Sequence, residues 1–320
     1  MVDNIFVVNT PFQYYVCEVI VEQKFGDINY FSNTIISTYH HNENESEKVK
    51  TVYVRNSLRY SVRDLNKVHI FLKEKTSNPD TANFFIPHVN NLISSYIFSQ
   101  LKWGNISVYY EGVALFYDSV VKLPKYKILQ RYILGFLSGI KYKNFSTLHP
   151  QRLRAIASVY TPVPKFTIDF AKQEYFEFPR IELNDTTNKV MILLPPFETV
   201  KEYENAKKIV DYLSSCNVQS HFYLKPHFEN REKVLNNLIA YAGTKNIKFQ
   251  ILEKGKTVEQ LIALNNIKTI YASYFSSAFV NFKLMYGDLL KITLICNEDV
   301  IAVWRKYIDH FNINVIEPLC

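Results

Sequence analysis

Residues 5–26 read IFVVNTPFQYYVCEVIVEQKFG, and this stretch has the pattern of a strand, a tight turn and a helix. The apolar run 5–8 predicts a short buried strand, and apolar residues at helical spacing follow it. Thr10 is a preferred N-cap, Pro11 suits the first helical position, and Gln13 completes a capping box. The glycine that closes the stretch suits a left-handed helix end. The chain therefore opens with a predicted α/β unit.

The same alternation of elements continues through the amino-terminal half. Apolar runs predict further strands at 51–54, 68–72, 83–86 and 106–110. A helix is predicted at 92–101. Strands that alternate with helices favour a parallel sheet, because parallel neighbours need a crossover connection between them.

The pattern breaks in the middle of the chain and then restarts. Proline-rich residues at 161–164 and polar residues at 184–188 are typical of turns and loops. A chain of 320 residues also exceeds the usual size of one core. We therefore predict a first domain at 1–160, a linker at 161–188 and a second domain at 189–320.

The second domain repeats the alternation of strands and helices. Its predicted strands are 190–194, 220–225, 247–252, 268–272 and 292–296, and its predicted helices are 202–213, 229–241, 258–264 and 277–286. The last helix, at 300–310, is a candidate to pack back on the first domain. We expect an α/β protein of two Rossmann-like parallel-sheet domains that face each other across a cleft.

The composition limits the classes of protein to which the chain can belong. Apolar residues make up 48%, but no run approaches the ~18 apolar residues that a membrane span needs. The net charge of +7 suits an anionic ligand or a membrane surface, and the dense basic stripe of a nucleic-acid binder is missing. The start lacks the pattern of a signal peptide, and the four scattered cysteines match neither a zinc site nor a disulfide scaffold. We expect a cytoplasmic protein with reduced thiols.

Ser276 and Ser277 stand between a predicted strand and an apolar predicted helix. The N-terminus of a helix attracts phosphate, because free N–H groups and the positive end of the helix dipole lie there. The two hydroxyl groups would add hydrogen bonds to that phosphate. The alternative is plain capping, because serine is a preferred N-cap.

Lys225-Pro226-His227 ends the predicted strand 220–225. Because proline stops the strand, we expect His227 at the carboxyl edge of the sheet, where ligands collect in open parallel sheets. An imidazole changes charge near neutral pH and can donate a hydrogen bond to a departing phosphate. The alternative is an ordinary surface histidine.

Glu111-Gly112 follows the predicted strand 106–110. The glycine permits a tight turn and leaves room beside the acid. A carboxylate in a water-poor cleft is a credible general base that would take the proton of a sugar hydroxyl. The alternative is a surface turn that contains an acid.

In this order, the three elements resemble motifs of the bacterial sialyltransferases that build lipooligosaccharide, O-antigen and capsule, including glycosyltransferase family 52 and the polysialyltransferases. Those enzymes have an acid-acid-glycine motif, a histidine-proline motif, and a serine-serine or serine-threonine motif. The similar segments here are Tyr110-Glu111-Gly112, Lys225-Pro226-His227-Phe228 and Ser276-Ser277. Residues 9–13 also look like the first strand-to-helix turn of that family, so the resemblance extends along the whole chain.

The resemblance implies a GT-B fold and an inverting, metal-independent transfer of sialic acid from CMP-sialic acid to a hydroxyl of a glycan acceptor, such as a terminal galactose. It implies that Glu111 is the general base and that His227 assists the departing phosphate. The implied substrate-binding residues are Thr10, Gln13, Gly112, Lys225, Ser276 and Ser277. No cofactor is implied, and the sequence has no Asp-x-Asp motif for a metal-bound diphosphate.

Two positions depart from the pattern of the family. Tyr110 replaces the first acid, and Phe228 replaces the proline after the histidine. A literal His149-Pro150 pair exists, but it lies in a basic stretch before the predicted linker, so we prefer His227. These departures leave open a transferase that uses another nucleotide-activated ulosonic acid or a nucleoside-diphosphate sugar. A noncatalytic carbohydrate- or nucleotide-binding protein also remains open.

Residues 121–145 combine six Lys and Arg residues with many apolar residues. Basic and apolar faces together favour an anionic membrane surface, such as the inner face of a membrane that holds a lipid-linked acceptor. The alternative is an ordinary core helix with a solvated basic rim.

Overall fold

The computed structural model describes residues 3–26, 34–37, 50–53, 62–75, 78, 80–87, 92–99, 105–112, 125–137, 156–164, 172–183, 188–197, 200–216, 220–227, 230–252 and 256–317. The chain divides into two compact units, Met1–Phe178 and Pro179–Cys320. The division falls inside the predicted linker 161–188. That interval also contains a strand of the first unit that the sequence pattern did not predict.

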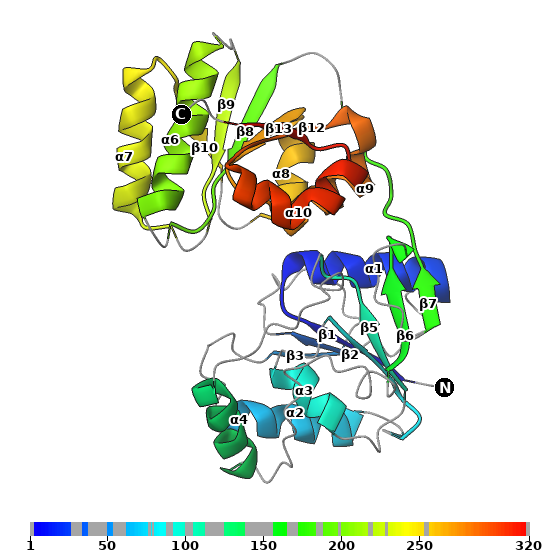
Figure 1. Ribbon diagram of the computed structural model, residues 1–320. Coiled ribbons are helices and arrows are strands. Elements are labelled where there is room, and N and C mark those ends of the chain that lie inside the picture. The colour runs from blue at the N-terminus through cyan, green and yellow to red at the C-terminus, as the bar shows by residue number, and fades with distance from the viewer. Residues whose placement is uncertain are drawn as a thin grey trace. The chain divides into compact units, whose positions relative to one another are not determined.

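The described part of the first unit contains one parallel sheet of seven strands, in the order β3-β2-β1-β4-β5-β6-β7 (Figure 1). The strands are β1 (Asn4–Val8), β2 (Thr34–Ser37), β3 (Lys50–Tyr53), β4 (Asn83–Ile86), β5 (Asn105–Tyr109), β6 (Ile156–Thr161) and β7 (Lys172–Tyr175). All neighbouring strands are paired in parallel. The order reverses between β1 and β4, and such a switch point is a usual ligand-binding place at the carboxyl ends of strands.

Helices cover both faces of this sheet. They are α1 (Pro11–Phe25), α2 (Val62–Lys75), α3 (Leu92–Ser99) and α4 (Lys125–Leu137). In Figure 1, α1 lies on one face, and α2 and α3 lie on the other. β1 is buried along its whole length, and after Asn4 it is entirely apolar because helices pack on both sides of the sheet.

The predicted strand 68–72 is wrong, because these residues lie inside α2. Leu65, Val68 and Leu72 are buried and recur at helical spacing. Lys67 and Ile70, which lie between them, are exposed. The short apolar run is therefore the inner side of a helix, a case in which run length alone does not separate the two structures.

The second unit contains another parallel sheet, with six strands among its described residues in the order β10-β9-β8-β11-β12-β13. The strands are β8 (Lys189–Leu193), β9 (His221–Lys225), β10 (Phe249–Ile251), β11 (Thr269–Ala272), β12 (Lys291–Ile295) and β13 (Asn314–Ile316). The helices are α6 (Val200–Ser215), α7 (Glu232–Thr244), α8 (Val258–Asn265), α9 (Ser277–Tyr286) and α10 (Glu298–His310), with a 3-10 turn at Gly287–Leu289. The switch point of this sheet lies between β8 and β11.

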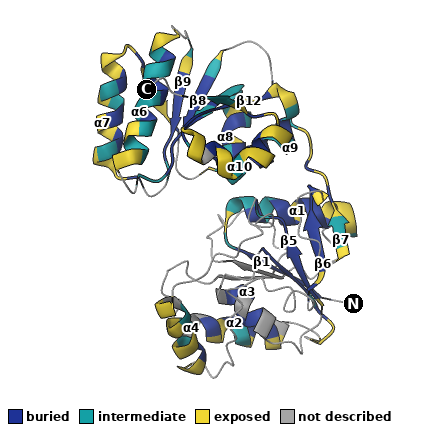
Figure 2. Ribbon diagram, in the orientation of Figure 1, coloured by how far each residue is buried: buried dark blue, intermediate teal, exposed yellow. Residues whose placement is uncertain are grey.

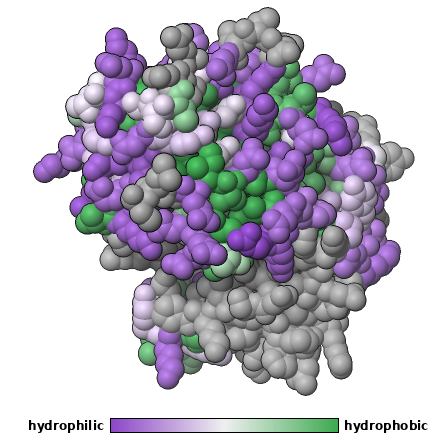
Figure 3. Space-filling view, turned by 45° about the horizontal axis from the view of Figure 1, so that its top comes forward, coloured by the Kyte–Doolittle hydropathy of each residue, from purple (hydrophilic) through white to green (hydrophobic). Residues whose placement is uncertain are grey.

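The core of the second unit follows from the amphipathic pattern of α6. Ala206, Ile209, Val210 and Leu213 lie on one side of this helix and are buried in a cluster with residues of β8 and β9. Each of the larger side chains, Ile209, Val210 and Leu213, contributes about 1.5–3 kcal/mol on burial. Figure 2 shows the strands mainly as buried and the outer sides of α6 and α7 as exposed. On the face that Figure 3 shows, hydrophilic side chains surround a smaller hydrophobic area.

Helix α8 begins with a capping box. The Thr257 side chain accepts a hydrogen bond from the Gln260 backbone N–H, and the Gln260 side chain accepts one from the Thr257 N–H. Within the described ranges, no helix is long and apolar enough to cross a membrane.

Candidate functional site

The chain turns sharply at the carboxyl ends of β1 and β5 in the first unit, with β4 between these two strands. Thr10 follows β1 as the N-cap of α1, and its hydroxyl accepts a hydrogen bond from the Gln13 N–H at 3.2 Å. Glu111 follows β5. The Gln13 side chain reaches from the end of β1 toward the end of β5, and its Nε2 donates a hydrogen bond to Glu111 Oε2 at 2.6 Å. The sequence predicted Gln13 in the first turn of the helix that follows one strand and Glu111 directly after another strand, and the structure joins their side chains directly.

The Gln13 amide is held in one orientation. Its Oε1 accepts a hydrogen bond from the Asn9 backbone N–H at 2.7 Å, so its Nε2 is the atom that faces Glu111. The predicted capping box is therefore shifted by one residue, because Asn9 donates in place of Thr10. Gln13 is only 4% exposed, and a buried, doubly bonded amide fixes the position of the carboxylate that it contacts.

Two neighbours of Glu111 have clear structural roles. Tyr110, which stands where the similar family has an acid, is buried, and its ring packs edge-on against Phe12 and Phe178. Its N–H also donates to the Tyr160 carbonyl. Gly112 has φ of 123°, a conformation that strongly favours glycine. These two positions fix the backbone on either side of the acid.

Tyr109 is a supporting residue that the sequence pattern did not reveal. Its hydroxyl donates to the Val7 carbonyl at 2.6 Å and so ties β5 to β1. Burial raises the pKa of Tyr109 well above its ordinary value, and the neighbouring Cys17 and Glu111 raise it further. Tyr109 therefore stays protonated and keeps this hydrogen bond at neutral pH.

The predicted residues of the second unit lie at the carboxyl edge of one sheet. His227 follows β9, and the serine pair follows β11. These strands flank β8, so their ends are separated by two strand spacings, about 10 Å. His227, Ser276 and Ser277 are all half-buried.

Ser276 is the N-cap of α9, and its hydroxyl accepts a hydrogen bond from the Ala278 N–H at 3.3 Å. The capping role considered for this residue is thus present. Ser277 is the first residue of the helix. The helix N-terminus places partial positive charge at this edge, whichever serine contacts a ligand.

Lys225 is the last residue of β9 and is buried, with its carbonyl accepting a hydrogen bond from the Leu194 N–H. The His227 carbonyl accepts one from the Asn230 N–H at 3.0 Å. The backbone around His227 is therefore anchored on both sides. Phe228 and the alternative pair His149-Pro150 lie outside the described residues.

Two buried polar residues at this edge were missed from sequence. The Asn230 Oδ1 accepts a hydrogen bond from the Phe197 N–H at 2.8 Å, which links the segments after β8 and β9. The Asn230 Nδ2 and the Ser273 Oγ are buried and have no hydrogen-bond partner among the described residues. Buried polar atoms in native proteins usually bind protein, ligand or water. This edge therefore has polar binding capacity beyond the predicted residues.

Tyr274 also supports the edge, because its hydroxyl lies 3.4 Å from the Leu194 carbonyl at the end of β8. Burial raises the pKa of Tyr274, so the hydroxyl remains a donor. This contact joins the segment after β11 to β8. In the sequence, the only indication of this role was the position of Tyr274 between a predicted strand and the serine pair.

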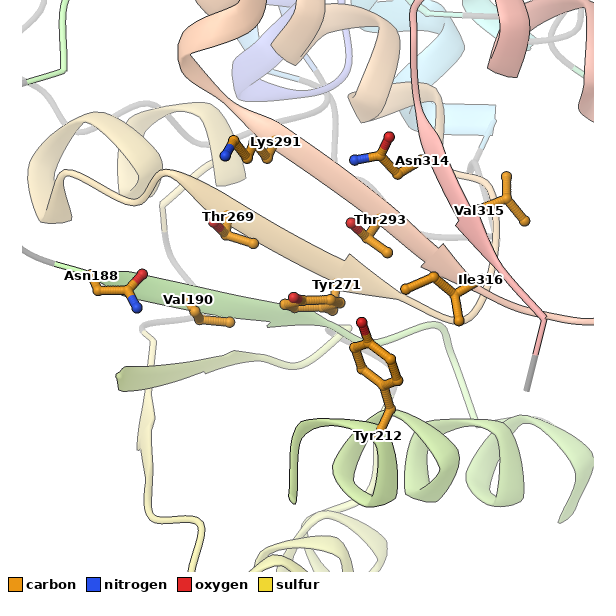
Figure 4. Close-up of a pocket in the computed structure, with 10 residues that line it drawn as sticks. All are labelled: Asn188, Val190, Tyr212, Thr269, Tyr271, Lys291, Thr293, Asn314, Val315 and Ile316. Atoms are coloured by element: carbon orange, nitrogen blue, oxygen red, sulfur yellow. The ribbon is translucent and has the colours of Figure 1, made fainter. Parts of the chain in front are cut away.

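A cavity of about 560 Å³ lies elsewhere in the second unit. Figure 4 shows Tyr212 of α6 and side chains from the strands around it. It is lined by Asn188, Val190, Tyr212, Thr269, Tyr271, Lys291, Thr293, Asn314, Val315 and Ile316. Several of these residues begin strands, whereas the predicted site residues follow strand ends. None of the predicted site residues lines this cavity.

Comparisons with known proteins place the fold. No family model matches the chain, and no curated protein sequence matches it. A UGT transferase from Siraitia grosvenorii in complex with UDP is similar over 98% of this chain and 86% of its own, with TM-score 0.54 and 8% identity. UDP-GlcNAc 2-epimerase from Methanocaldococcus jannaschii, in complex with UDP-GlcNAc and UDP, covers 98% and 88%, with TM-score 0.53 and 13% identity.

MurG from Acinetobacter baumannii is similar over 98% of this chain and 85% of its own, with TM-score 0.51 and 10% identity. At such identities the likeness concerns the fold alone. The chain has the α/β architecture of GT-B glycosyltransferases, with two parallel-sheet units. The predicted fold class, an α/β protein with two parallel-sheet domains, is confirmed.

Proposed function

We propose that this protein is an inverting glycosyltransferase that moves a sugar from a nucleotide-activated donor to a hydroxyl of a glycan acceptor. Within this class, we propose CMP-sialic acid as the donor and the cytoplasm as the location. The observation that carries the proposal is the Gln13–Glu111 hydrogen bond, which holds a carboxylate at a switch-point edge of a GT-B sheet. The order of the three motifs supports sialic acid as the sugar.

In the proposed reaction, the acceptor hydroxyl oxygen attacks the anomeric carbon of the donor sugar. Glu111 takes the hydroxyl proton as the new carbon–oxygen bond forms. The bond between the anomeric carbon and the phosphate oxygen breaks, and the phosphate leaves with the electron pair. Attack opposite the leaving group inverts the configuration. Gln13 acts as a positioning residue, because its Nε2 holds Glu111 Oε2.

The second unit supplies the groups for the departing phosphate in this proposal. His227 donates a hydrogen bond to it, and Ser276 and Ser277 bind it together with the backbone N–H groups that begin α9. Donors preorganised around developing negative charge can each be worth about 3–4 kcal/mol in a water-poor site. The buried Asn230 amide, at the same edge, is a further candidate donor.

Another nucleotide sugar is the second candidate donor. Two of the three solved structures named above are complexes with UDP, and one of these two is an epimerase. Tyr110 also removes one acid of the sialyltransferase pattern. A nucleoside-diphosphate sugar would place a second phosphate at the edge formed by β9, β8 and β11.

A donor screen tests the proposed function. The purified full chain is incubated with CMP-sialic acid, UDP-GlcNAc or UDP-glucose and with acceptors that end in galactose, N-acetylgalactosamine or sialic acid, in the presence of a metal chelator. We expect a product heavier by one sialic acid, together with CMP. A product formed only from a UDP-sugar would replace the proposed donor, and an absolute requirement for a divalent metal would contradict the mechanism. Nucleotide binding without any product would indicate a binding protein.

A further inference from the structure

Helix α4 has its large apolar side chains on the outside of the first unit. Thirteen large hydrophobic residues are exposed among the described residues, and six of them belong to this single helix. They are Tyr126, Leu129, Tyr132, Ile133, Phe136 and Leu137. Figure 2 shows α4 as mostly exposed. An exposed apolar group of this density marks an interaction surface.

The exposed apolar side chains of α4 lie on the side of the helix that faces away from α2. α4 contacts α2, and Gly135 is buried while Ile128 and Leu134 are half-buried. The opposite side contains Phe136, which is 84% exposed, and Leu129, which is 61% exposed. In an ordinary surface helix the apolar side faces the core. The predicted alternative of a core helix with a solvated rim therefore does not describe these residues.

The charge around α4 identifies the kind of partner. Residues 119–168 contain nine Lys and Arg and no Asp or Glu. The rest of the chain contains the other 28 Lys and Arg residues and all 30 Asp and Glu residues, so its positive and negative charges nearly balance. The positive charge of the protein is thus concentrated in the sequence around this helix. A second copy of the same helix would bring like charges together, whereas an anionic surface would be attracted.

The dimensions and residue types of α4 fit a helix that lies on a bilayer. Thirteen residues span about 20 Å, which is shorter than the ~30 Å hydrocarbon core of a membrane. Tyr126, Tyr132 and Phe136 are aromatic, and aromatic side chains are favoured at the membrane–water interface. We propose that the outer face of α4 docks the protein on an anionic phospholipid bilayer. This surface is separate from the residues proposed for sugar transfer.

Vesicle flotation of the full chain tests this proposal without measuring transfer, so its outcome is independent of the proposed reaction. We expect at least about tenfold stronger binding to vesicles that contain phosphatidylglycerol than to phosphatidylcholine alone, and weaker binding in high salt. The paired change Leu129→Asp and Phe136→Asp should lower binding about tenfold or more. The pair Lys125→Gln and Lys127→Gln should lower it roughly tenfold.

The matched control is Val303→Asp, because Val303 is 68% exposed on α10, a helix of the second unit. This variant should float like the unchanged protein. Equal flotation with neutral and anionic vesicles, or no flotation, would overturn the proposal. So would a dimer that dissociates in the Leu129→Asp and Phe136→Asp variant, since that result would make the face a self-association surface.

Discussion

Replacing Gln13 by alanine tests the most specific contact of the first unit. The substitution removes the hydrogen bond from Gln13 Nε2 to Glu111 Oε2 and the acceptor of the Asn9 N–H. A hydrogen bond to a charged group is worth about 1.5–3 kcal/mol, and an unsatisfied buried N–H costs about 1–3 kcal/mol. Because the two effects share one side chain, we expect the free energy of unfolding to fall by about 2–4 kcal/mol.

The same change should slow the reaction more than it weakens substrate binding. Without Gln13, the Glu111 carboxylate loses its fixed position, and a displacement of about 1 Å can cost up to ~100-fold in rate. We expect kcat to fall about 10- to 100-fold while KM for the donor stays within about twofold. Steady-state kinetics with a range of donor concentrations measure both constants, and urea unfolding measures the stability.

Gln23→Ala is the matched control for Gln13→Ala. Gln23 lies on the same helix and exchanges hydrogen bonds with the backbone of Glu177, but these bonds are exposed. The control should lose about 1 kcal/mol or less of stability and retain its kcat. If Gln13→Ala lost stability and kept the kcat of the unchanged protein, Gln13 would be purely structural and its role as a positioning residue would be refuted.

Three further predictions concern the second unit. Ser276→Ala should lower the free energy of unfolding by about 0.5–2 kcal/mol through loss of the N-cap, whereas Ser277→Ala should barely change it. Calorimetric titration with CMP should show weaker binding in both variants. His227→Ala should reduce kcat roughly 100-fold, and an unchanged rate of CMP release would remove His227 from the mechanism. Burial raises the pKa of Glu259, so the folded state holds its proton more tightly than the unfolded chain and stability falls as pH rises above the ordinary value of 4.5. Glu259→Gln, which can still accept the Asn281 hydrogen bond, should flatten this fall in urea unfolding from acid to neutral pH, and the exposed Glu182→Gln should not.

Local rules predicted the elements that position the site. The strand and helix around Thr10 follow from an apolar run, a capping residue and a proline, and all three features act within a few residues. Alternating strands and helices likewise predicted parallel sheets in both units. The turn at Gly112 was predictable because glycine is the usual residue where the chain adopts a positive φ, as it does here.

Contacts between distant residues could not be predicted in the same way. The Gln13–Glu111 bond joins residues 98 positions apart, and it depends on β1, β4 and β5 being adjacent in the sheet. The link between Asn230 and Phe197 depends in the same way on the pairing of β8 with β9. The strands 34–37 and 172–175 were missed because the first is short and the second is polar, and the sheet pairs them regardless of propensity. The strand 156–161 was also missed, although it is six residues long and mostly apolar. For residues 121–145 the sequence left a membrane-facing segment and a core helix both open, and the exposure of the apolar side chains of α4 decides between them.

The transfer rate of Glu111→Gln with CMP-sialic acid and a galactose-terminated acceptor tests the central claim most directly. Glutamine keeps the size of the side chain but does not accept the acceptor's proton, so we expect kcat to fall about 10²- to 10⁴-fold, with CMP affinity within about twofold. Glu22→Gln, an exposed acid on α1, should react like the unchanged protein. Transfer by Glu111→Gln at the rate of the unchanged protein would contradict the assignment of Glu111 as the base.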